Sequence, residues 1–292
     1  MLKLGFIGAG TVGTALAVRL SNKGYPVVAV SSRSQISAEN LARAISHCRV
    51  FNNSQDVVDI AELVFVTTPD DAIVQVVSQL KWHRGQSVVH CSGSDSTETL
   101  QPAKKLGVYV GVFHPLQTFA SAKQAMENIP GSTFALEAEE PLLGTLKDMA
   151  AALDGHWIEL KASDKVIYHA AAVTACNYVV TLVKLATDLW QTFHIPPHQA
   201  TQALLPLLKG TISNIENIGI PQCLTGPIAR GDSGTIKKHI SALEEVAPAI
   251  LSTYRELGLQ TIPIALAKGR INEQQAQEMK NILSGESNEN NA

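Results

Sequence analysis

The feature that most constrains the fold of this chain is a glycine-rich run near its start, Gly8-Ala9-Gly10-Thr11-Val12-Gly13. An apolar stretch that predicts a strand, 2–7, precedes the run, and a stretch with helical periodicity, 11–23, follows it. A G-x-G-x-x-G spacing is a weak signal alone, but between a strand and a helix it is typical of a dinucleotide-binding turn. In such a turn, the first glycine permits the tight bend of the chain, and the second lets the backbone approach the pyrophosphate of the dinucleotide. The third lets the helix pack closely on the strand. The sequence therefore predicts dinucleotide contacts from Gly8, Gly10, Thr11, Val12 and Gly13, with the phosphates at the helix start.

The hydrophobic pattern divides the 292 residues into two parts. Short apolar runs alternate with helical periods up to residue 160, and this alternation predicts a parallel sheet with helices on both faces. Strands are expected at 2–7, 27–31, 63–67, 87–91, 109–113, 133–136 and 157–160, and helices at 11–23, 38–47, 72–82 and 141–153. From residue 163 onward only helical periodicity is found, at 163–193, 198–218, 233–258 and 272–283, with Pro206 as an expected kink or break. The prediction is an α/β Rossmann domain, 1–160, followed by an all-α domain, 161–292, which ends in a frayed polar tail, 284–292.

The end of the second predicted strand discriminates between NAD and NADP. An NAD site usually places an acidic residue there to bind the ribose 2′-hydroxyl. This chain has Ser31-Ser32-Arg33 instead, so no carboxylate repels a 2′-phosphate, and Arg33 can pair with it. The sequence therefore favours NADPH, with Ser31, Ser32 and Arg33 as contacts.

Two further segments follow predicted strands, where ligands bind in open α/β sheets. Thr67-Thr68-Pro69 is expected to line the ribose on the nicotinamide side or the pyrophosphate. The segment His90-Cys91-Ser92-Gly93-Ser94 is expected near the nicotinamide, with Ser92 as a cofactor contact, although a purely structural turn is the alternative.

The start of the long helical stretch offers groups for proton transfer. Lys165 and His169 are four residues apart, so they share one helix face close to the expected domain junction. Either side chain could protonate an oxygen that gains charge during hydride transfer. Asn177 lies on a similar side, but eight residues past His169 it is roughly 12 Å further along the axis. It is a candidate for substrate binding or for a buried amide that ties helices together.

Two more segments are candidates for substrate binding. His114 directly follows the strand expected at 109–113 and could bond the substrate or the nicotinamide amide. Arg230 lies in the unusual loop 222–232 and could clamp a carboxylate through two parallel hydrogen bonds. Asp232 could position Arg230 or cap the helix that follows. The alternative for this loop is a glycine-rich helix connection with an exposed ion pair.

Composition and charge point away from several other classes of protein. The net charge of −3 gives no basic excess that would attract nucleic acid or an anionic membrane. The four cysteines are widely spaced, and no metal site is predicted from them or from the histidines. The most apolar helical stretch, 170–189, contains Lys184 and Asp188, so it is expected to be a buried helix rather than a membrane span. A cytoplasmic location is expected.

These motifs together resemble a family that pairs a Rossmann-like NADP-binding domain with a C-terminal helical domain long known only as a domain of unknown function. The residues that carry the resemblance are Gly8–Gly13, His114-Pro115-Leu116, Lys165-x-x-Tyr168-His169-Ala170-Ala171, Asn177 and the loop from Leu224 to Asp232. Some members are assigned as an alternative ketopantoate reductase, which reduces 2-dehydropantoate to pantoate with NADPH. The chain is also distantly similar to β-hydroxyacid dehydrogenases, in which asparagine follows the helix-start lysine four residues later; here that position is His169. The His114-Pro115 pair also resembles one in prephenate dehydrogenases.

The resemblance implies an NADPH-dependent reductase of a small 2-oxo acid, with 2-dehydropantoate, a precursor in pantothenate biosynthesis, as the favoured substrate. Lys165 and His169 are then the catalytic candidates, and His114, Asn177, Arg230 and Asp232 the substrate-binding ones. The alternatives are an imine or pyrroline-carboxylate reductase, a prephenate-type dehydrogenase, and a non-catalytic sensor that binds NADPH. Relatives of this architecture bury apolar helices in dimers, so a homodimer is expected.

Overall fold

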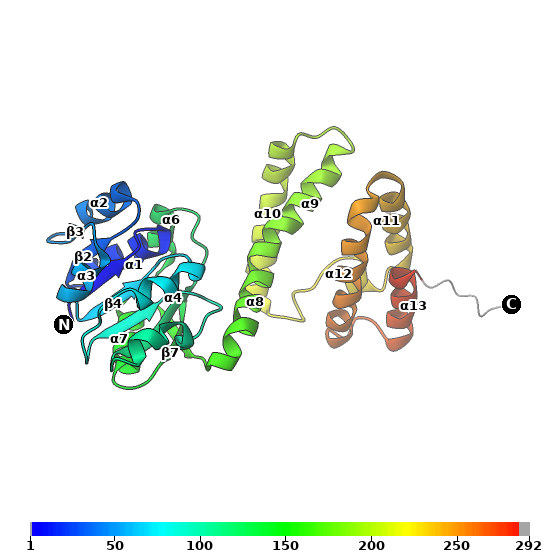
Figure 1. Cartoon of the computed structure of the whole chain (residues 1–292). Coiled ribbons are helices and arrows are strands. Elements are labelled where there is room, and N and C mark those ends of the chain that lie inside the picture. The colour runs from blue at the N-terminus through cyan, green and yellow to red at the C-terminus, as the bar shows by residue number, and fades with distance from the viewer. Residues whose placement is uncertain (1, 286–292) are drawn as a thin grey trace. The chain divides into compact units, whose positions relative to one another are not determined.

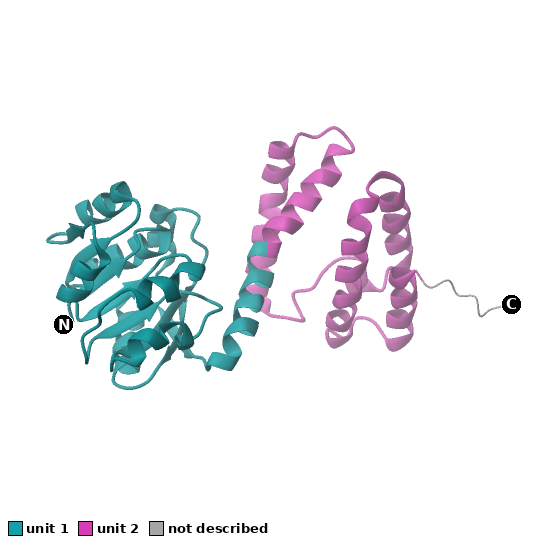
Figure 2. Cartoon of the chain, in the orientation of Figure 1, with its two compact units in different colours: residues 1–177 teal, residues 178–292 magenta. Residues whose placement is uncertain are grey.

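The computed structural model describes residues 2–285 and divides the chain into two compact units, 1–177 and 178–292 (Figure 2). Each unit is described by itself. The predicted polar tail lies mostly outside the described residues. The predicted domain boundary between residues 160 and 161 stays a prediction. The boundary between the compact units lies after Asn177.

Unit 1 is built on one eight-stranded sheet with the strand order β3-β2-β1-β4-β5-β6-β7-β8. Figure 1 shows this sheet with helices packed around it. The strands are β1 (Leu4–Ile7), β2 (Val27–Ser31), β3 (Arg49–Phe51), β4 (Leu63–Val66), β5 (Ser87–His90), β6 (Tyr109–Leu116), β7 (Thr133–Ala138) and β8 (His156–Glu159). All neighbours are parallel except β6 and β7, which pair antiparallel. The prediction of a parallel sheet is therefore correct for β1 to β6 and wrong at β7.

Helices cover both faces of this sheet, and its central strands are buried between them, whereas the edge strand β8 is exposed. The helices are α1 (Thr11–Asn22), α2 (Gln35–Arg43), α3 (Ser54–Ile60), α4 (Asp70–Ser78), α5 (Gln101–Lys104), α6 (Ala122–Asn128), α7 (Leu142–Ala152) and α8 (Lys165–Ala175). One apolar cluster joins the sheet to α1, α2, α6 and α7, and a second joins its other face to α3, α4 and α5. The central strands β1, β4 and β5 are buried along their whole length, which explains their near-continuous apolar sequences.

The strand order places a topological switch point at β1, which lies between β2 and β4. The chain connections leave β1 in opposite directions, so the carboxyl ends of β1 and β4 open a crevice where ligands bind in such sheets. Gly8 follows β1, Thr67 follows β4 and Cys91 follows β5 at this edge. The fold thus places the glycine turn and the segments after β4 and β5 at the same edge of the sheet.

Unit 2 is helical, with its apolar core on its last three helices. It contains most of α9 (Asn177–Gln191), then α10 (Pro197–Ile218), α11 (Ser233–Val246), α12 (Pro248–Ala267) and α13 (Glu273–Ser284). The core joins α11, α12 and α13 through buried residues such as Ile236, Ile262 and Met279. By contrast, α9 and α10 bury only Thr187 and Ala200 among their described residues.

The prediction missed the helices α3, α5 and α6 of unit 1, and it differs from the structure in the helical part of the chain as well. The stretch expected at 163–193 is interrupted at Cys176, between α8 and α9. The stretch expected at 233–258 breaks at Ala247, because Pro248 lacks an N–H and restricts the residue before it. Pro206, by contrast, lies inside α10 without ending it.

One helical stretch, Ala162–Gln191, is long and apolar enough to cross a membrane by length and composition alone. No part of its most apolar window is buried inside the structure, so the expectation of a buried core helix is wrong for this chain taken alone. A single helix of this length and composition also occurs as a core helix or a signal sequence in proteins that do not span a membrane. The stretch also carries the ion pair of Lys184 Nζ with Asp188 Oδ2, at 2.7 Å, which is costly in lipid.

Candidate active site

The switch point of the sheet holds a cavity of about 550 Å³. Three of the predicted cofactor segments line it: the glycine turn, the end of β2 and the end of β4. The lining residues that were predicted are Gly8, Gly10, Ser32, Arg33, Thr67, Thr68 and Pro69. The structure therefore brings together residues as far apart in the chain as Gly8 and Pro69, at the place where a Rossmann sheet binds a dinucleotide.

The glycines of the turn show why a larger side chain is excluded. Gly8 has φ +110°, and a Cβ there would lie 2.6 Å from the carbonyl oxygen of Thr67. A Cβ on Gly13 would lie 2.6 Å from the carbonyl oxygen of Gly8 and would also meet Thr67 Oγ1. A Cβ on Gly10 would meet no protein atom within 4 Å. Gly8 and Gly13 are thus required by the fold, whereas Gly10 leaves room beside the cavity.

The cavity also presents groups that suit phosphate and ribose. No side chain caps the start of α1, and the first turn of this helix has no acidic residue, so its N–H groups can bind an anion. Thr68 Oγ1 is buried without a hydrogen-bond partner in the described chain. A buried hydroxyl without a partner is unfavourable unless a ligand satisfies it. These features fit a bound dinucleotide.

Two predicted cofactor residues have internal roles in the structure. Ser31 is buried, its hydroxyl lies 3.0 Å from Ser54 Oγ, and its carbonyl accepts a hydrogen bond from the Gly8 N–H at 2.8 Å. Ser92 is buried too: its hydroxyl donates to Asp70 Oδ2 at 2.7 Å, and its N–H donates to His90 Nδ1 at 3.1 Å. Thr11 and Val12 open α1 without lining the cavity. Direct cofactor contacts of these four residues stay predictions.

Lys165 occupies an unusual position for a lysine, because only 1% of it is exposed. Its Nζ donates to the carbonyl oxygen of Ser92 at 3.1 Å, which ties the start of α8 to the turn after β5. Burial lowers the pKa of Lys165 to about 8, although Glu137, Asp95, Cys91 and Asp70 act in the opposite direction. A buried amine with a pKa near neutrality is typical of proton-transfer sites.

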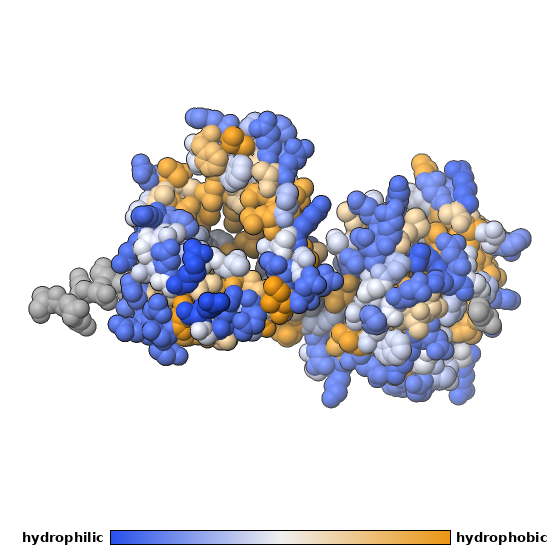
Figure 3. All heavy atoms as spheres, turned by 180° about the vertical axis from the view of Figure 1, so that it is seen from behind, coloured by the Kyte–Doolittle hydropathy of each residue, from blue (hydrophilic) through white to orange (hydrophobic). Residues whose placement is uncertain are grey.

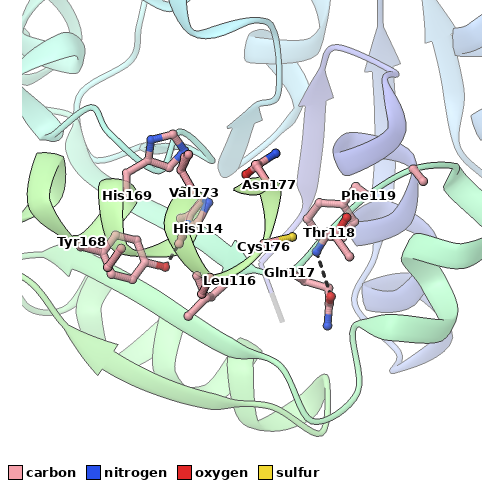
Figure 4. Close-up of a pocket in the computed structure, with 14 residues that line it drawn as sticks. His114, Leu116, Gln117, Thr118, Phe119, Tyr168, His169, Val173, Cys176 and Asn177 are labelled. Atoms are coloured by element: carbon pink, nitrogen blue, oxygen red, sulfur yellow. Dashed lines mark hydrogen bonds between the residues drawn. The ribbon is translucent and has the colours of Figure 1, made fainter. Parts of the chain in front are cut away.

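Three aromatic side chains, His114, Tyr168 and His169, form a cluster beside this lysine. His114 Nδ1 lies 2.8 Å from the Tyr168 hydroxyl, and the rings of His114 and His169 stand edge to face with centroids 6.4 Å apart (Figure 4). Lys165 Nζ lies 5.9 Å from the centroid of the Tyr168 ring. Burial lowers the pKa of His114 to about 3, with the charges of Lys165 and the neighbouring histidines acting in the same direction. His114 is therefore neutral at pH 7 and can act as a hydrogen-bonding group, while Lys165 can carry the proton.

The turn after β5 approaches the two histidines closely. A Cβ on Gly93 would lie 2.5 Å from His169 Cδ2 and 2.9 Å from His114 Nε2. Only glycine lets the backbone reach these rings. The segment 90–94 was singled out in the sequence, but this contact was not predicted, because it joins residues far apart in the chain.

A cavity of about 680 Å³ adjoins this cluster and lies wholly within unit 1. Its lining includes His114, Tyr168, His169 and Asn177, together with the segment 116–120 and small residues of α8 (Figure 4). Asn177 thus lines the same cavity as His169 despite its distance along the helix. No lysine or arginine is among the residues that line this cavity in the described chain.

Arg230 and Asp232 lie in unit 2. Asp232 caps α11: its Oδ1 accepts from the Thr235 N–H at 3.0 Å, and its Oδ2 accepts from the Thr235 hydroxyl at 2.7 Å. Arg230 Nη2 is 4.0 Å from Asp232 Oδ2, the limit for an ion pair. The capping alternative for Asp232 is therefore correct, and the substrate roles of both residues stay predictions.

Tyr168 is the site residue whose role the sequence did not predict. It lies three residues after Lys165, so it shares the helix face already assigned to Lys165 and His169. That spacing was the available signal. Its partner, His114, is 54 residues away and could be found only from the fold.

The fold and these sites define a Rossmann-like protein with an added helical domain, and comparisons with known proteins agree. The family model of the Rossmann-like domain matches residues 1–115, and that of the domain of unknown function DUF2520 matches residues 132–261. The chain therefore combines the two domains whose pairing the sequence motifs predicted. No curated protein matches the chain.

Solved structures share this fold over nearly the whole chain. A putative NADP oxidoreductase from Bacteroides fragilis is 26% identical, with a TM-score of 0.73 and coverage of 90% of this chain and 98% of that one. A reductive aminase from Aspergillus terreus, in complex with NADPH and ethyl-5-oxohexanoate, is 15% identical, with a TM-score of 0.64 and coverage of 98% and 93%. A 1-pyrroline-5-carboxylate reductase from Streptococcus pyogenes is 17% identical, with a TM-score of 0.60 and coverage of 96% and 98%. The last two likenesses concern the fold alone.

Proposed function

We propose that this protein is an NADPH-dependent reductase of a small 2-oxo acid, with 2-dehydropantoate as the favoured substrate. The observation that carries the proposal is the position of Lys165, a buried amine that is bonded to the turn after β5 and lies beside the cluster of His114, Tyr168 and His169. The same edge of the sheet carries the dinucleotide cavity. Similarity to an NADP oxidoreductase supports the choice of cofactor.

Side chains of this protein supply the proton and bind the substrate, whereas the cofactor supplies the hydride. NADPH, when bound, supplies a hydride to the carbonyl carbon. Lys165 is not among the residues that line the 680 Å³ cavity, but it lies against Tyr168, which lines it. We assign to Lys165 the protonation of the oxygen that gains charge, because an ammonium with a pKa of about 8 holds its proton at pH 7 and releases it readily. His114 and Tyr168, held 2.8 Å apart, present neutral hydrogen-bonding groups at the cavity wall. His169 and Asn177 line the same cavity and orient the substrate.

A direct assay tests the proposal. Purified protein mixed with NADPH and 2-dehydropantoate is expected to oxidise NADPH and to release pantoate in equal amounts, both measured by chromatography. If other 2-oxo acids react and 2-dehydropantoate does not, the substrate assignment is wrong. Tight NADPH binding without turnover of any substrate would instead favour the sensor.

One observation favours a second candidate, a reductase of imines. The 680 Å³ cavity has no cationic residue in its lining, so within unit 1 a substrate carboxylate has no opposite charge beside it there. A reductive aminase whose structure holds the neutral ketone ethyl-5-oxohexanoate shares this fold. A pyrroline-carboxylate reductase shares it too, but its substrate carries a carboxylate and gains no support from this observation. A panel that pairs each keto acid with cyclic imines separates the two reactions, and prephenate with NADP in the reverse direction covers the dehydrogenase alternative.

We further propose that the protein forms a homodimer through α9 and α10. These helices expose apolar side chains, and Figure 3 shows hydrophobic residues gathered over them. The exposed set comprises Tyr178, Val179, Val180, Leu182, Leu205, Leu207, Ile212, Ile215 and Ile218. Exposed apolar faces of this extent mark interaction surfaces.

Light scattering is expected to give twice the subunit mass of 31.2 kDa. Ile212→Glu, which places a charge on this face, is expected to shift the mass toward that of the monomer. Ile36→Glu is a matched control, because Ile36 is an apolar residue on α2 in unit 1 that is even more exposed than Ile212. A mass near 31.2 kDa for the unmodified protein refutes the dimer.

A further inference from the structure

Unit 2 contains a cavity of about 370 Å³ whose polar lining is cationic. Arg230 comes from the loop before α11, and Lys268 and Arg270 come from the turn between α12 and α13. Thr225 and the backbone of Gly226 complete its polar wall. No acidic residue of the described chain lines this cavity. Three like charges around one hollow repel one another, so the arrangement favours an anion within it.

The loop that forms one wall is held firmly to the core of unit 2. Leu224 and Ile228 pack against the buried cluster of α11, α12 and α13. Lys268 Nζ donates to the carbonyl oxygens of Gln222 and Leu224, at 2.8 and 2.6 Å. The backbones that carry Arg230 and Arg270 are therefore fixed, which lowers the entropic cost of binding a ligand between them.

The two guanidinium groups are available to a ligand. Asp232, the acid beside Arg230, uses both carboxylate oxygens to cap α11, and its closest approach to Arg230 is 4.0 Å. Arg270 has no ion pair in the described chain, and Lys268 retains one N–H after its two bonds to carbonyls. The cavity thus offers donors that no protein acceptor satisfies.

We propose that this cavity binds the carboxylate or phosphate group of a small molecule, held between Arg230 and Arg270 and completed by Lys268. Planar guanidinium groups bind such anions through paired hydrogen bonds, and Lys268 adds a point charge. Arg230 was predicted from the sequence to bind a carboxylate, and the cavity places Lys268 and Arg270 beside it. Its existence does not depend on the proposed reaction; only its use as the substrate's carboxylate site does.

Binding is measured on the full chain saturated with NADPH, so that the dinucleotide cavity cannot take the probe. The side-chain N–H signals of arginine are followed by NMR as sodium phosphate or sodium acetate replaces sodium chloride at constant ionic strength. Saturable shifts are expected for Arg230 and Arg270. Arg270→Gln is expected to weaken binding at least tenfold, as read on Arg230, while Arg43→Gln, which removes an exposed arginine of α2 in unit 1, leaves it unchanged. If the shifts do not saturate and are equal in the unmodified protein, Arg270→Gln and Arg43→Gln, the proposal is wrong.

Kinetics then separate the two sources of the anion. If the cavity holds the substrate's carboxylate, Arg270→Gln raises the KM of the 2-oxo acid at least tenfold and leaves the KM of NADPH unchanged. If it holds a phosphate-bearing ligand of another kind, phosphate binding is lost while the KM of the 2-oxo acid stays the same. Absence of any 2-oxo acid turnover would refute the proposed function and leave the binding result standing.

Discussion

Lys165→Met is expected to reduce the rate of NADPH-dependent reduction by on the order of 10²–10⁴-fold, the usual contribution of a positioned acid. Methionine retains the length and the apolar stem of lysine, so it fills the buried site without the cost of a buried charge. The variant should therefore fold and bind NADPH as the unmodified protein does. Stopped-flow measurement of a single turnover, together with fluorescence titration of NADPH, checks both expectations.

The pH dependence provides an independent test of Lys165. Its pKa of about 8 means that the ammonium, the form that donates a proton, predominates below that pH and is lost above it. The kcat/KM for reduction is therefore expected to fall as the pH rises through about 8, and Lys165→Met should lack this limb. His114, with a pKa of about 3, contributes no step near neutrality.

Lys184→Met is the matched control for Lys165. Lys184 lies in α9, where it is exposed and paired with Asp188, so its loss should leave both rate and pH profile unchanged. Should Lys165→Met keep more than about a tenth of the activity, the proton comes from another group. His169, the other proton donor that the sequence suggests, lies in the same cluster and lines the cavity, and it would then be the candidate.

The fold could be predicted where the sequence pattern is strong. Buried strands such as Leu63–Val66 are continuous apolar runs, and the division into an α/β part and a helical part follows from periodicity alone. The strand Arg49–Phe51 was missed, because three residues that begin with an exposed arginine give no periodic signal. The antiparallel pairing of β6 with β7 was missed as well, because the direction of a strand is set by its connection and not by its composition.

Only part of the candidate site, too, could be predicted from the sequence. The glycine turn, the end of β2 and the pair Lys165 and His169 could be identified from local spacing. The NADPH prediction agrees with the similarity to an NADP oxidoreductase. Contacts between distant segments could not be identified, such as His114 with Tyr168 or Gly93 with both histidines. Sequence thus indicated which residues carry chemistry, and the fold was needed to show which of them meet.

Gly10→Ala is expected to weaken NADPH binding by on the order of 100-fold, or about 2.7 kcal/mol, while leaving the fold intact. The residue has φ −75° and ψ −172°, which alanine adopts without strain, and the added Cβ meets no protein atom within 4 Å. The methyl group would lie at the start of α1, where the backbone must approach the pyrophosphate. Thermal unfolding should change by no more than a few degrees, and isothermal titration with NADPH measures the loss of affinity.

Substitutions at two other glycines distinguish a loss of NADPH binding from a loss of stability. Gly13→Ala forces a Cβ to 2.6 Å from the Gly8 carbonyl oxygen, so it should lower the unfolding temperature as well as the affinity. Gly210→Ala, in the middle of α10 with no atom within 4 Å, should raise stability slightly and leave NADPH binding unchanged. If Gly10→Ala binds NADPH as tightly as the unmodified protein, the pyrophosphate does not lie on this turn. The cavity lined by Arg33 and Thr68 would then hold some other ligand, because its fit to a dinucleotide depends on the free N–H groups beside Gly10.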